Sequence, residues 1–175
     1  MRTFIALDIS SEMKGELSRL EEELKKADAD VKWVKVDNVH LTLKFLGNIE
    51  EPEIEQIKKT LDGISSQEKP FEISLFKLGA FPNLNYPRVI WVGIDKGCSE
   101  VEKIAGLLET DRFSAHLTLG RVKSGKNKLA LKEKLSSLEV QPKSCTVNNI
   151  TLFQSTLTPK GPIYTSLYVS TFTGR

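Results

Sequence analysis

The sequence predicts a bilobal α+β fold in which mainly antiparallel sheets face a central cleft and helices lie outside. Apolar residues recur with period two in some segments and with period 3.6 in others, which indicates strands and helices respectively. Many of the predicted strands come in neighbouring pairs, which favours antiparallel pairing. The second half of the chain repeats the plan of the first with no low-complexity linker between them. We therefore expect two intertwined lobes, related by a pseudo-twofold axis, within one domain of residues 1–175.

The first half of the chain contains three predicted strands and two predicted helices. Apolar runs indicate strands at 4–9, 31–36 and 39–46, the last two joined by a polar turn. Apolar residues spaced three or four apart indicate helices at 11–27 and 51–63. A proline stands at the start of the second helix, where its missing N–H does no harm.

The second half follows the same rules. The segment between its first two strands is rich in Pro and Asn, as loops are. The predicted strands are 71–76, 88–94, 115–122, 146–153 and 164–171, and the predicted helices are 99–108 and 128–138.

The composition is that of a soluble globular protein, with 25 basic and 23 acidic side chains, a net charge of +2 and 39% hydrophobic residues. No apolar stretch approaches the roughly 20 residues that cross a bilayer, and the N-terminal strand lacks a signal-peptide cleavage site. We therefore expect a cytoplasmic protein without a membrane segment. Basic residues are concentrated between Arg121 and Lys143. Such a run is typical of a solvated helix face, and it attracts anions only if a phosphate site lies beside it.

The two histidines of the chain open the same tetrapeptide, H-L-T-L, at residues 40–43 and 116–119. By composition alone, the second histidine would be followed by these three residues in about one case in a thousand. Because side chains alternate between the two faces of a strand, His and Thr share one face and the leucines face the core. A hydrogen-bonded surface pair is the ordinary interpretation of one such motif. Two matched copies favour a functional interpretation.

Two histidines and two threonines suit the cleavage of a phosphodiester. Because the ordinary pKa of an imidazole is about 6.5, one imidazole can remove a proton while the other delivers one at neutral pH. Threonine hydroxyls can donate hydrogen bonds to the non-bridging oxygens, where negative charge builds up. This set needs no metal and no cofactor. A zinc site is the competing use of histidine, but a hydrolytic zinc takes three protein ligands and the motifs supply two imidazoles.

A phosphate-binding loop is a second alternative. Residues 120–127 read G-R-V-K-S-G-K-N, which matches G-x-x-x-x-G-K-[ST] except at its last position and lies between a predicted strand and helix. The position that differs would supply the hydroxyl that binds magnesium. We therefore interpret Lys123 and Lys126 as part of a basic rim rather than as a nucleotide site.

The paired H-x-T-x motifs resemble the signature of the 2H phosphoesterases. Within that superfamily the chain is similar to the RNA 2′,3′-cyclic phosphodiesterases, also called 2′-5′ RNA ligases. The resemblance extends to R-T-F-I-A-L-D, F-P-N-L-N-Y-P-R-V-I-W and S-T-L-T-P-K-G-P-I-Y. It implies a bilobal fold with both motifs in the cleft, and hydrolysis of a terminal 2′,3′-cyclic phosphate of RNA to a 2′-phosphate. It also implies, for some members, ATP-independent joining or cleavage of 2′-5′ linkages.

Carried over residue by residue, the resemblance implies that His40 is the proton donor to the 3′-oxygen and His116 the proton acceptor that activates water. Thr42 and Thr118 would hold the phosphate, and Arg121 would contact the nucleotide. Strict alternation places Arg121 on the leucine face, so its role requires a bulge at the preceding glycine or the end of the strand there.

RNA is the expected partner, without a membrane or an obligate protein partner, and we expect a monomer. An RNA-end or nucleotide-binding protein without turnover is the alternative function. The connection of residues 110–112, beside the second motif, is shorter than in similar proteins and bears on substrate access. No base-stacking platform stands out, because aromatic residues at strand positions are usually core. The aromatic candidates are Phe4, Phe45, Tyr86 and Phe113.

Overall fold

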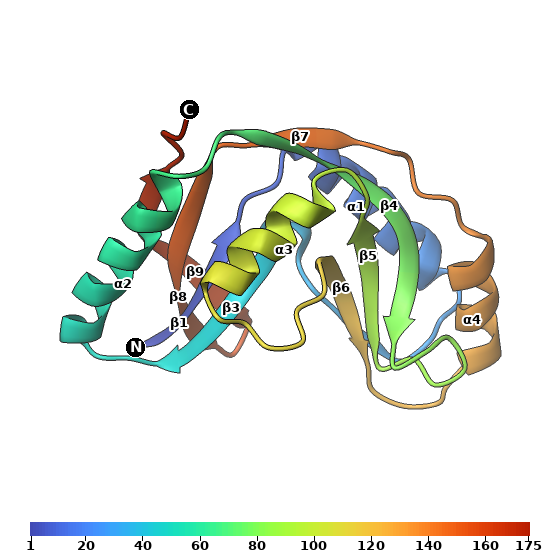
Figure 1. The fold of residues 1–175 in the computed structure, drawn as a ribbon. Coiled ribbons are helices and arrows are strands. Elements are labelled where there is room, and N and C mark those ends of the chain that lie inside the picture. Colours follow the sequence, from blue (N-terminus) through green and yellow to red (C-terminus); the bar gives the residue numbers. More distant parts are fainter.

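The structure is a computed structural model that describes all residues 1–175, and it contains two antiparallel sheets that lie side by side (Figure 1). The strand order is β3-β1-β8-β9 in one sheet and β2-β6-β5-β4-β7 in the other. The predicted α+β class with antiparallel sheets is confirmed. The strands are β1 (Arg2–Leu7), β2 (Val31–Trp33), β3 (Leu41–Asn48), β4 (Phe71–Phe81), β5 (Val89–Ile94), β6 (His116–Val122), β7 (Ser144–Val147), β8 (Asn149–Thr158) and β9 (Gly161–Thr171).

Four α-helices and one 3₁₀ helix pack around these sheets. Figure 1 shows α2 at one end of the molecule, against β8 and β9, and α4 at the other. No helix is both long enough and apolar enough to cross a membrane. The helices are α1 (Ser11–Lys25), α2 (Glu51–Ser65), α3 (Cys98–Leu107), α4 (Lys128–Ser137) and the 3₁₀ helix η1 (Val36–Asn38).

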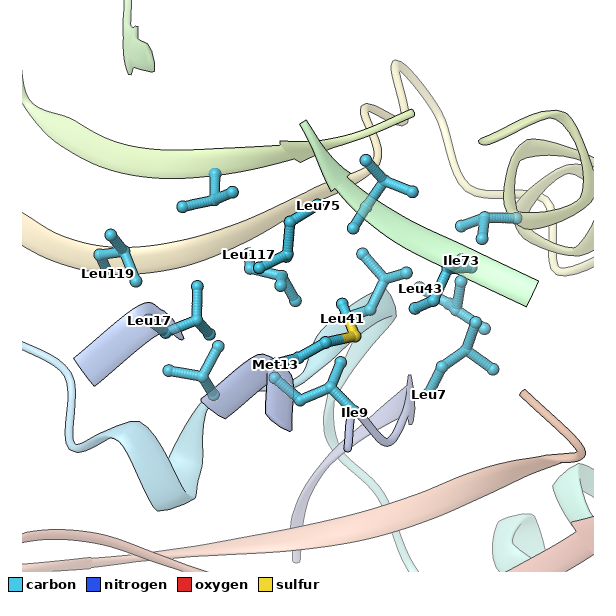
Figure 2. Close-up of a cluster of buried hydrophobic side chains, with 14 of the residues drawn as sticks. Leu7, Ile9, Met13, Leu17, Leu41, Leu43, Ile73, Leu75, Leu117 and Leu119 are labelled. Carbon is cyan, nitrogen blue, oxygen red and sulfur yellow. The ribbon is translucent and has the colours of Figure 1, made fainter. Parts of the chain in front are cut away.

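The leucines of both H-L-T-L motifs lie in the main cluster of buried apolar side chains. Leu41 and Leu43 of β3 share this cluster with Leu117 and Leu119 of β6, beside Met13 of α1 (Figure 2). Each of these leucines is at most 1% exposed. The leucines therefore face the core, as alternation predicts, and the His and Thr side chains occupy the opposite face of each strand.

The sequence prediction was wrong about the strand at 146–153. The chain forms two strands there, with β7 pairing with β4 in one sheet and β8 pairing with β1 in the other. The β8–β9 hairpin is also longer than predicted, since β9 begins at Gly161 and includes Pro162. Because β9 is an edge strand, a proline can stand in it without removing a central ladder hydrogen bond.

Two other strands end at places that differ from the prediction by three residues or more, and most of the remaining boundaries shift by one or two residues. The strand expected at 31–36 ends at Trp33, and η1 follows it. The strand expected at 71–76 continues to Phe81, past a register shift between Leu75 and Leu78. The third helix begins at Cys98 and ends at Leu107, one residue earlier at each end than predicted. It follows Gly97, whose left-handed φ of 82° favours glycine. These differences arise from strand pairing and chain direction, which local periodicity does not contain.

Glu21 of α1 is a buried carboxylate outside the motifs. It is 5% exposed, and its Oε1 has no hydrogen-bond partner. Burial raises its pKa from 4.5 to about 7, and the charge of Lys25 opposes this shift. The folded state therefore holds this proton more tightly than the unfolded chain does. Consequently the contribution of Glu21 to the free energy of unfolding is fully present at low pH and is lost as the pH rises from 4.5 through about 7.

Glu21→Gln is expected to raise the free energy of unfolding at pH 8 by about 2 kcal/mol. The pKa shift alone corresponds to about 3 kcal/mol, and the glutamine amide loses part of this gain because it is buried where Oε1 has no hydrogen-bond partner. Below pH 4 the variant and the wild type should be equally stable. Urea unfolding at both pH values measures this, with Glu22→Gln at the exposed neighbouring position as the control. An equal gain at both pH values would mean that removal of the buried charge is not the cause.

Candidate active site

A cleft of about 710 Å³ lies between the two sheets. Residues from β1, β3, β6 and β9 line it, as does the short connection of residues 110–112. The structure brings all of the site residues singled out in the sequence into this cleft: His40, Thr42, His116, Thr118 and Arg121.

The two histidines are held in matching ways. His40 stands directly before β3, and its Nδ1 lies 3.0 Å from the carbonyl oxygen of Asn38. His116 opens β6, and its Nδ1 lies 2.7 Å from the carbonyl oxygen of Ser114. Because a carbonyl oxygen can only accept a hydrogen bond, Nδ1 carries the hydrogen and donates it in both rings. In each ring, Nε2 is therefore the nitrogen that can exchange a proton with a substrate.

Each histidine also packs against a phenylalanine from its own sheet. The ring centroid of His40 lies 4.6 Å from that of Phe153 in β8, and the ring centroid of His116 lies 5.1 Å from that of Phe81 in β4. Phe4 stacks on Phe153 with centroids 5.2 Å apart. With one nitrogen hydrogen-bonded and one ring face or edge in contact, both imidazoles have a defined orientation.

Trp91 of β5 supports the His116 side of the cleft. Its ring centroid lies 5.1 Å from that of Phe81, which in turn contacts His116. The indole occupies the space that side chains at Gly79 and Gly93 would need, since a Cβ atom on Gly79 would come within 2.3 Å of it. These two glycines therefore make room for the ring beneath the histidine.

Arg121 reaches the cleft through a β-bulge in β6. Two successive residues of β5 pair with Gly120 and Thr118, so Leu119 is an extra residue between them. Leu119 and Gly120 are both buried, whereas Arg121 is exposed and lines the cleft. A Cβ atom on Gly120 would come within 2.8 Å of the side chain of Val31 in β2. The bulge that the role of Arg121 requires is therefore present.

The electrostatic surroundings of His116 favour its neutral form. Burial is the main cause that lowers its pKa below 6.5, and the positive charge of Arg121 lowers it further. The hydrogen bond to Ser114 acts in the opposite direction. At neutral pH, Nε2 of His116 is thus largely unprotonated and can accept a proton.

Asp8 is a site residue that was missed in the sequence. Its Oδ1 lies 3.3 Å from Nε2 of His40, so the two form an ion pair when the imidazole is protonated. The hydrogen bond with His40 is the main cause that lowers the pKa of the Asp8 carboxyl, while burial opposes it. A signal was present, because Asp8 follows β1 in phase with Phe4 and Ala6, which pack with Phe153 beneath His40.

Most of the basic run between Arg121 and Lys143 lies outside the cleft. Only Arg121 and Lys123 line it. Lys126, the lysine of the loop that resembles a nucleotide site, instead lies 3.5 Å from Asp28 in an ion pair. Most of the basic run therefore lies on a solvated face, as predicted, and only Arg121 and Lys123 lie beside the two histidines in the cleft.

Three of the four aromatic candidates for base stacking line the cleft. Phe4, Phe45 and Phe113 do so, and Phe45 is 74% exposed. Tyr86 lies outside, with the amine of Lys128 4.3 Å above its ring. Nowhere in the structure do three or more His, Cys, Asp or Glu side chains come together as a group that could hold a metal ion.

Known proteins resemble this chain in sequence and in fold. The family model of the LigT-like phosphoesterases matches residues 7–91 and 96–164. A protein of Methanothermobacter thermautotrophicus named RNA 2′,3′-cyclic phosphodiesterase is 37% identical over 180 residues, covering 97% of each chain. A protein of Thermotoga maritima with the same name is 35% identical and covers 99% of this chain and 97% of its own.

Solved structures give the same result. A protein of Thermus thermophilus matches with a TM-score of 0.82 at 26% identity over 99% of both chains. The structure of E. coli LigT complexed with phosphate matches with a TM-score of 0.72 at 26% identity, over 98% of this chain and 97% of that one. By both sequence and fold, the chain belongs to the LigT-like phosphoesterases of the 2H superfamily.

Proposed function

We propose that the protein hydrolyses a 2′,3′-cyclic phosphate at the end of an RNA to a 2′-phosphate, with His40 as the proton donor and His116 as the proton acceptor. The observation that carries the proposal is the convergence of two imidazoles and two threonines on one cleft, each imidazole held through Nδ1 by a backbone carbonyl so that proton transfer falls to Nε2. The relatives named RNA 2′,3′-cyclic phosphodiesterase support the substrate class.

In the proposed reaction, water attacks the phosphorus atom while Nε2 of His116 takes one of its protons. The bond from phosphorus to the 3′-oxygen breaks, and Nε2 of His40 delivers a proton to that oxygen. The products are a 3′-hydroxyl and a phosphate that stays on the 2′-oxygen. The hydroxyls of Thr42 and Thr118 donate hydrogen bonds to the non-bridging oxygens, and the guanidinium of Arg121 adds a positive charge.

The division of roles follows from the difference between the two halves of the site. The carboxylate of Asp8 beside His40 pairs with a protonated imidazole, as a general acid requires. The burial and positive charge around His116 favour a neutral imidazole, as a general base requires. An RNA 5′-hydroxyl in place of the attacking water would give a 2′-5′ linkage by the same proton transfers. We propose this ligation as a second reaction of the same site.

The test uses an oligoribonucleotide that ends in a 2′,3′-cyclic phosphate, with EDTA present. The wild type is expected to convert it to a 2′-phosphate, identified by ³¹P NMR and by its resistance to a 3′-specific phosphatase. A second reaction with a 5′-hydroxyl RNA added tests for the 2′-5′ linkage. Retention of the RNA without any product would support the non-catalytic RNA-end binding alternative, and a 3′-phosphate product would contradict the proposed roles.

Asp8→Asn is expected to lower kcat at pH 7 by about tenfold, because the imidazolium of His40 loses the carboxylate that pairs with it. The acidic limb of the pH–rate profile, which reports the protonation of His116, should stay in place and lie below pH 6.5. The profile of kcat between pH 5 and 9 measures both effects. Asp95→Asn is the matched control, since Asp95 is an exposed carboxylate that likewise directly follows a strand, β5. An unchanged kcat, or a loss that the control variant shares, would mean that Asp8 takes no part in the proton transfer.

A further inference from the structure

We propose that Lys32, Arg121 and Lys123 form a subsite for the phosphates that precede the terminal nucleotide, so that the protein selects the end of an RNA chain over a cyclic mononucleotide. We call these three residues the basic row. The inference rests on the proposed function, because it takes the position of the terminal phosphate from the two histidines.

The basic row follows from the pairing of β2 with β6. Lys32 stands directly opposite Arg121, so the two side chains lie on the same face of the sheet. Lys123 comes two residues after Arg121, and its backbone N–H donates to the carbonyl of Asp30 at 2.7 Å, which continues the pairing past the end of β6. Two residues along a strand span roughly 6.6 Å and return to the same face. All three side chains line the cleft.

The placement of these charges is unfavourable for the free protein. Like charges directly opposite each other on neighbouring strands destabilise a sheet. None of the three side chains takes part in an ion pair within the protein. Lys44, which also lines the cleft, differs from them because its amine donates to the carbonyl of Leu108 at 2.6 Å. An anion bound across the basic row would relieve this repulsion.

The rest of the cleft carries the same sign of charge. Burial raises the pKa of Tyr164, and the positive charges of Arg2 and Arg121 oppose this shift. Arg2 lies on the sheet of His40 and Arg121 on the sheet of His116, so positive charge reaches this ring from both sheets. Among the charged side chains that line the cleft, eight are lysines or arginines and one, Asp111, is acidic. This excess suits a ligand with several phosphates better than one with a single charge.

The order of residues along β6 sets the direction of the RNA. His116 and Thr118 hold the terminal cyclic phosphate in the proposed function, and Arg121 and Lys123 follow along the same face. The next phosphate of an RNA is attached to the 5′-oxygen of the terminal ribose and therefore falls on the basic row when the chain runs outwards along β6. A 2′,3′-cyclic mononucleotide with a 5′-hydroxyl has no phosphate to place there.

The experiment compares the double variant Lys32→Ala/Lys123→Ala with the wild type on two substrates, a hexaribonucleotide ending in 2′,3′-cyclic phosphate and 2′,3′-cyclic AMP. The ratio of kcat/KM for the hexamer to that for the mononucleotide is expected to fall about tenfold, mainly through KM of the hexamer. Binding of the hexamer product with a 2′-phosphate end is measured against salt concentration. The slope of log Kd against log salt should decrease by about 1.4, or about 0.7 for each lost contact to single-stranded RNA.

The control is Lys59→Ala/Lys69→Ala, which removes the same charge from exposed positions outside the cleft, in and after α2. It should change neither the ratio nor the salt slope. Equal losses on both substrates, or an effect no larger than that of the control, would overturn the subsite while leaving the proposed hydrolysis intact. If the wild type hydrolyses neither substrate, the proposed function fails, and the salt slope of product binding still decides whether the basic row contacts RNA.

Discussion

Replacing either His40 or His116 with alanine is expected to lower kcat for hydrolysis of an RNA 2′,3′-cyclic phosphate by about 10²–10⁴-fold. In the proposed mechanism each imidazole moves one proton as the phosphate ring opens, and in each the Nδ1 hydrogen bond to a backbone carbonyl leaves that transfer to Nε2. The double variant should be little slower than the slower single variant, because residues that act as a unit are not additive. Single-turnover rates at pH 7 measure the effect.

The two variants should differ in ways that identify the acid and the base. In His116→Ala the acidic limb of the pH–rate profile should disappear, since no base remains to be protonated, and in His40→Ala the alkaline limb should disappear. A cyclic phosphorothiolate with sulfur in place of the 3′-oxygen gives a second criterion, because a thiolate leaves without receiving a proton. This substrate should restore much of the rate of His40→Ala and little of that of His116→Ala.

The opposite pattern of rescue would exchange the two roles, and it would leave the ion pair with Asp8 without a catalytic meaning. Full activity in either single variant would remove the mechanism altogether. Far-UV circular dichroism and urea unfolding provide the control for folding. The His40 side chain is only 9% exposed and packs against Phe153, so His40→Ala is the variant for which this control matters most.

The parts of this site that were predictable from sequence are those encoded locally. The alternation within H-L-T-L separates the leucines from the face that carries His and Thr without any knowledge of the partner strands, and the buried positions of Leu41 and Leu117 confirm it. From the sequence, one could say only that the role of Arg121 requires a bulge near Gly120. Whether the bulge forms depends on the register between β5 and β6. Local pattern and tertiary pairing thus contribute separate parts of the site.

Apart from Asp8, the residues that were missed are those whose role depends on strand pairing. In the sequence, Phe153 and Phe81 are ordinary apolar strand residues. Phe153 comes against His40 only because β1 pairs with both β8 and β3, and Phe81 comes against His116 only because β5 pairs with both β4 and β6. The same holds for Lys32, which becomes a neighbour of Arg121 only through the pairing of β2 with β6. These contacts join segments far apart in the chain, and periodicity carries no information about which segments pair.

Thr42→Val and Thr118→Val are each expected to lower kcat by about 10²–10³-fold, the usual loss for one hydrogen-bond donor to a developing oxyanion. Valine keeps the shape of threonine and replaces the hydroxyl with a methyl group, so the variants remove a donor without opening a cavity. Both threonines are partly exposed and line the cleft, while the leucines beside them hold the strands in the core. Single-turnover rates with saturating RNA isolate the effect on kcat.

Thr42→Ser and Thr118→Ser are the matched controls, because serine keeps the hydroxyl and lacks the methyl group. Each should retain activity within about tenfold of the wild type, since the donor to the non-bridging oxygen remains. If valine and serine reduce kcat equally, the methyl group and its packing matter and the hydroxyl does not. A change in KM alone would mean that the hydroxyl binds the phosphate equally well in the ground state and in the transition state. The threonines would then hold the substrate without stabilising the charge that develops during the reaction.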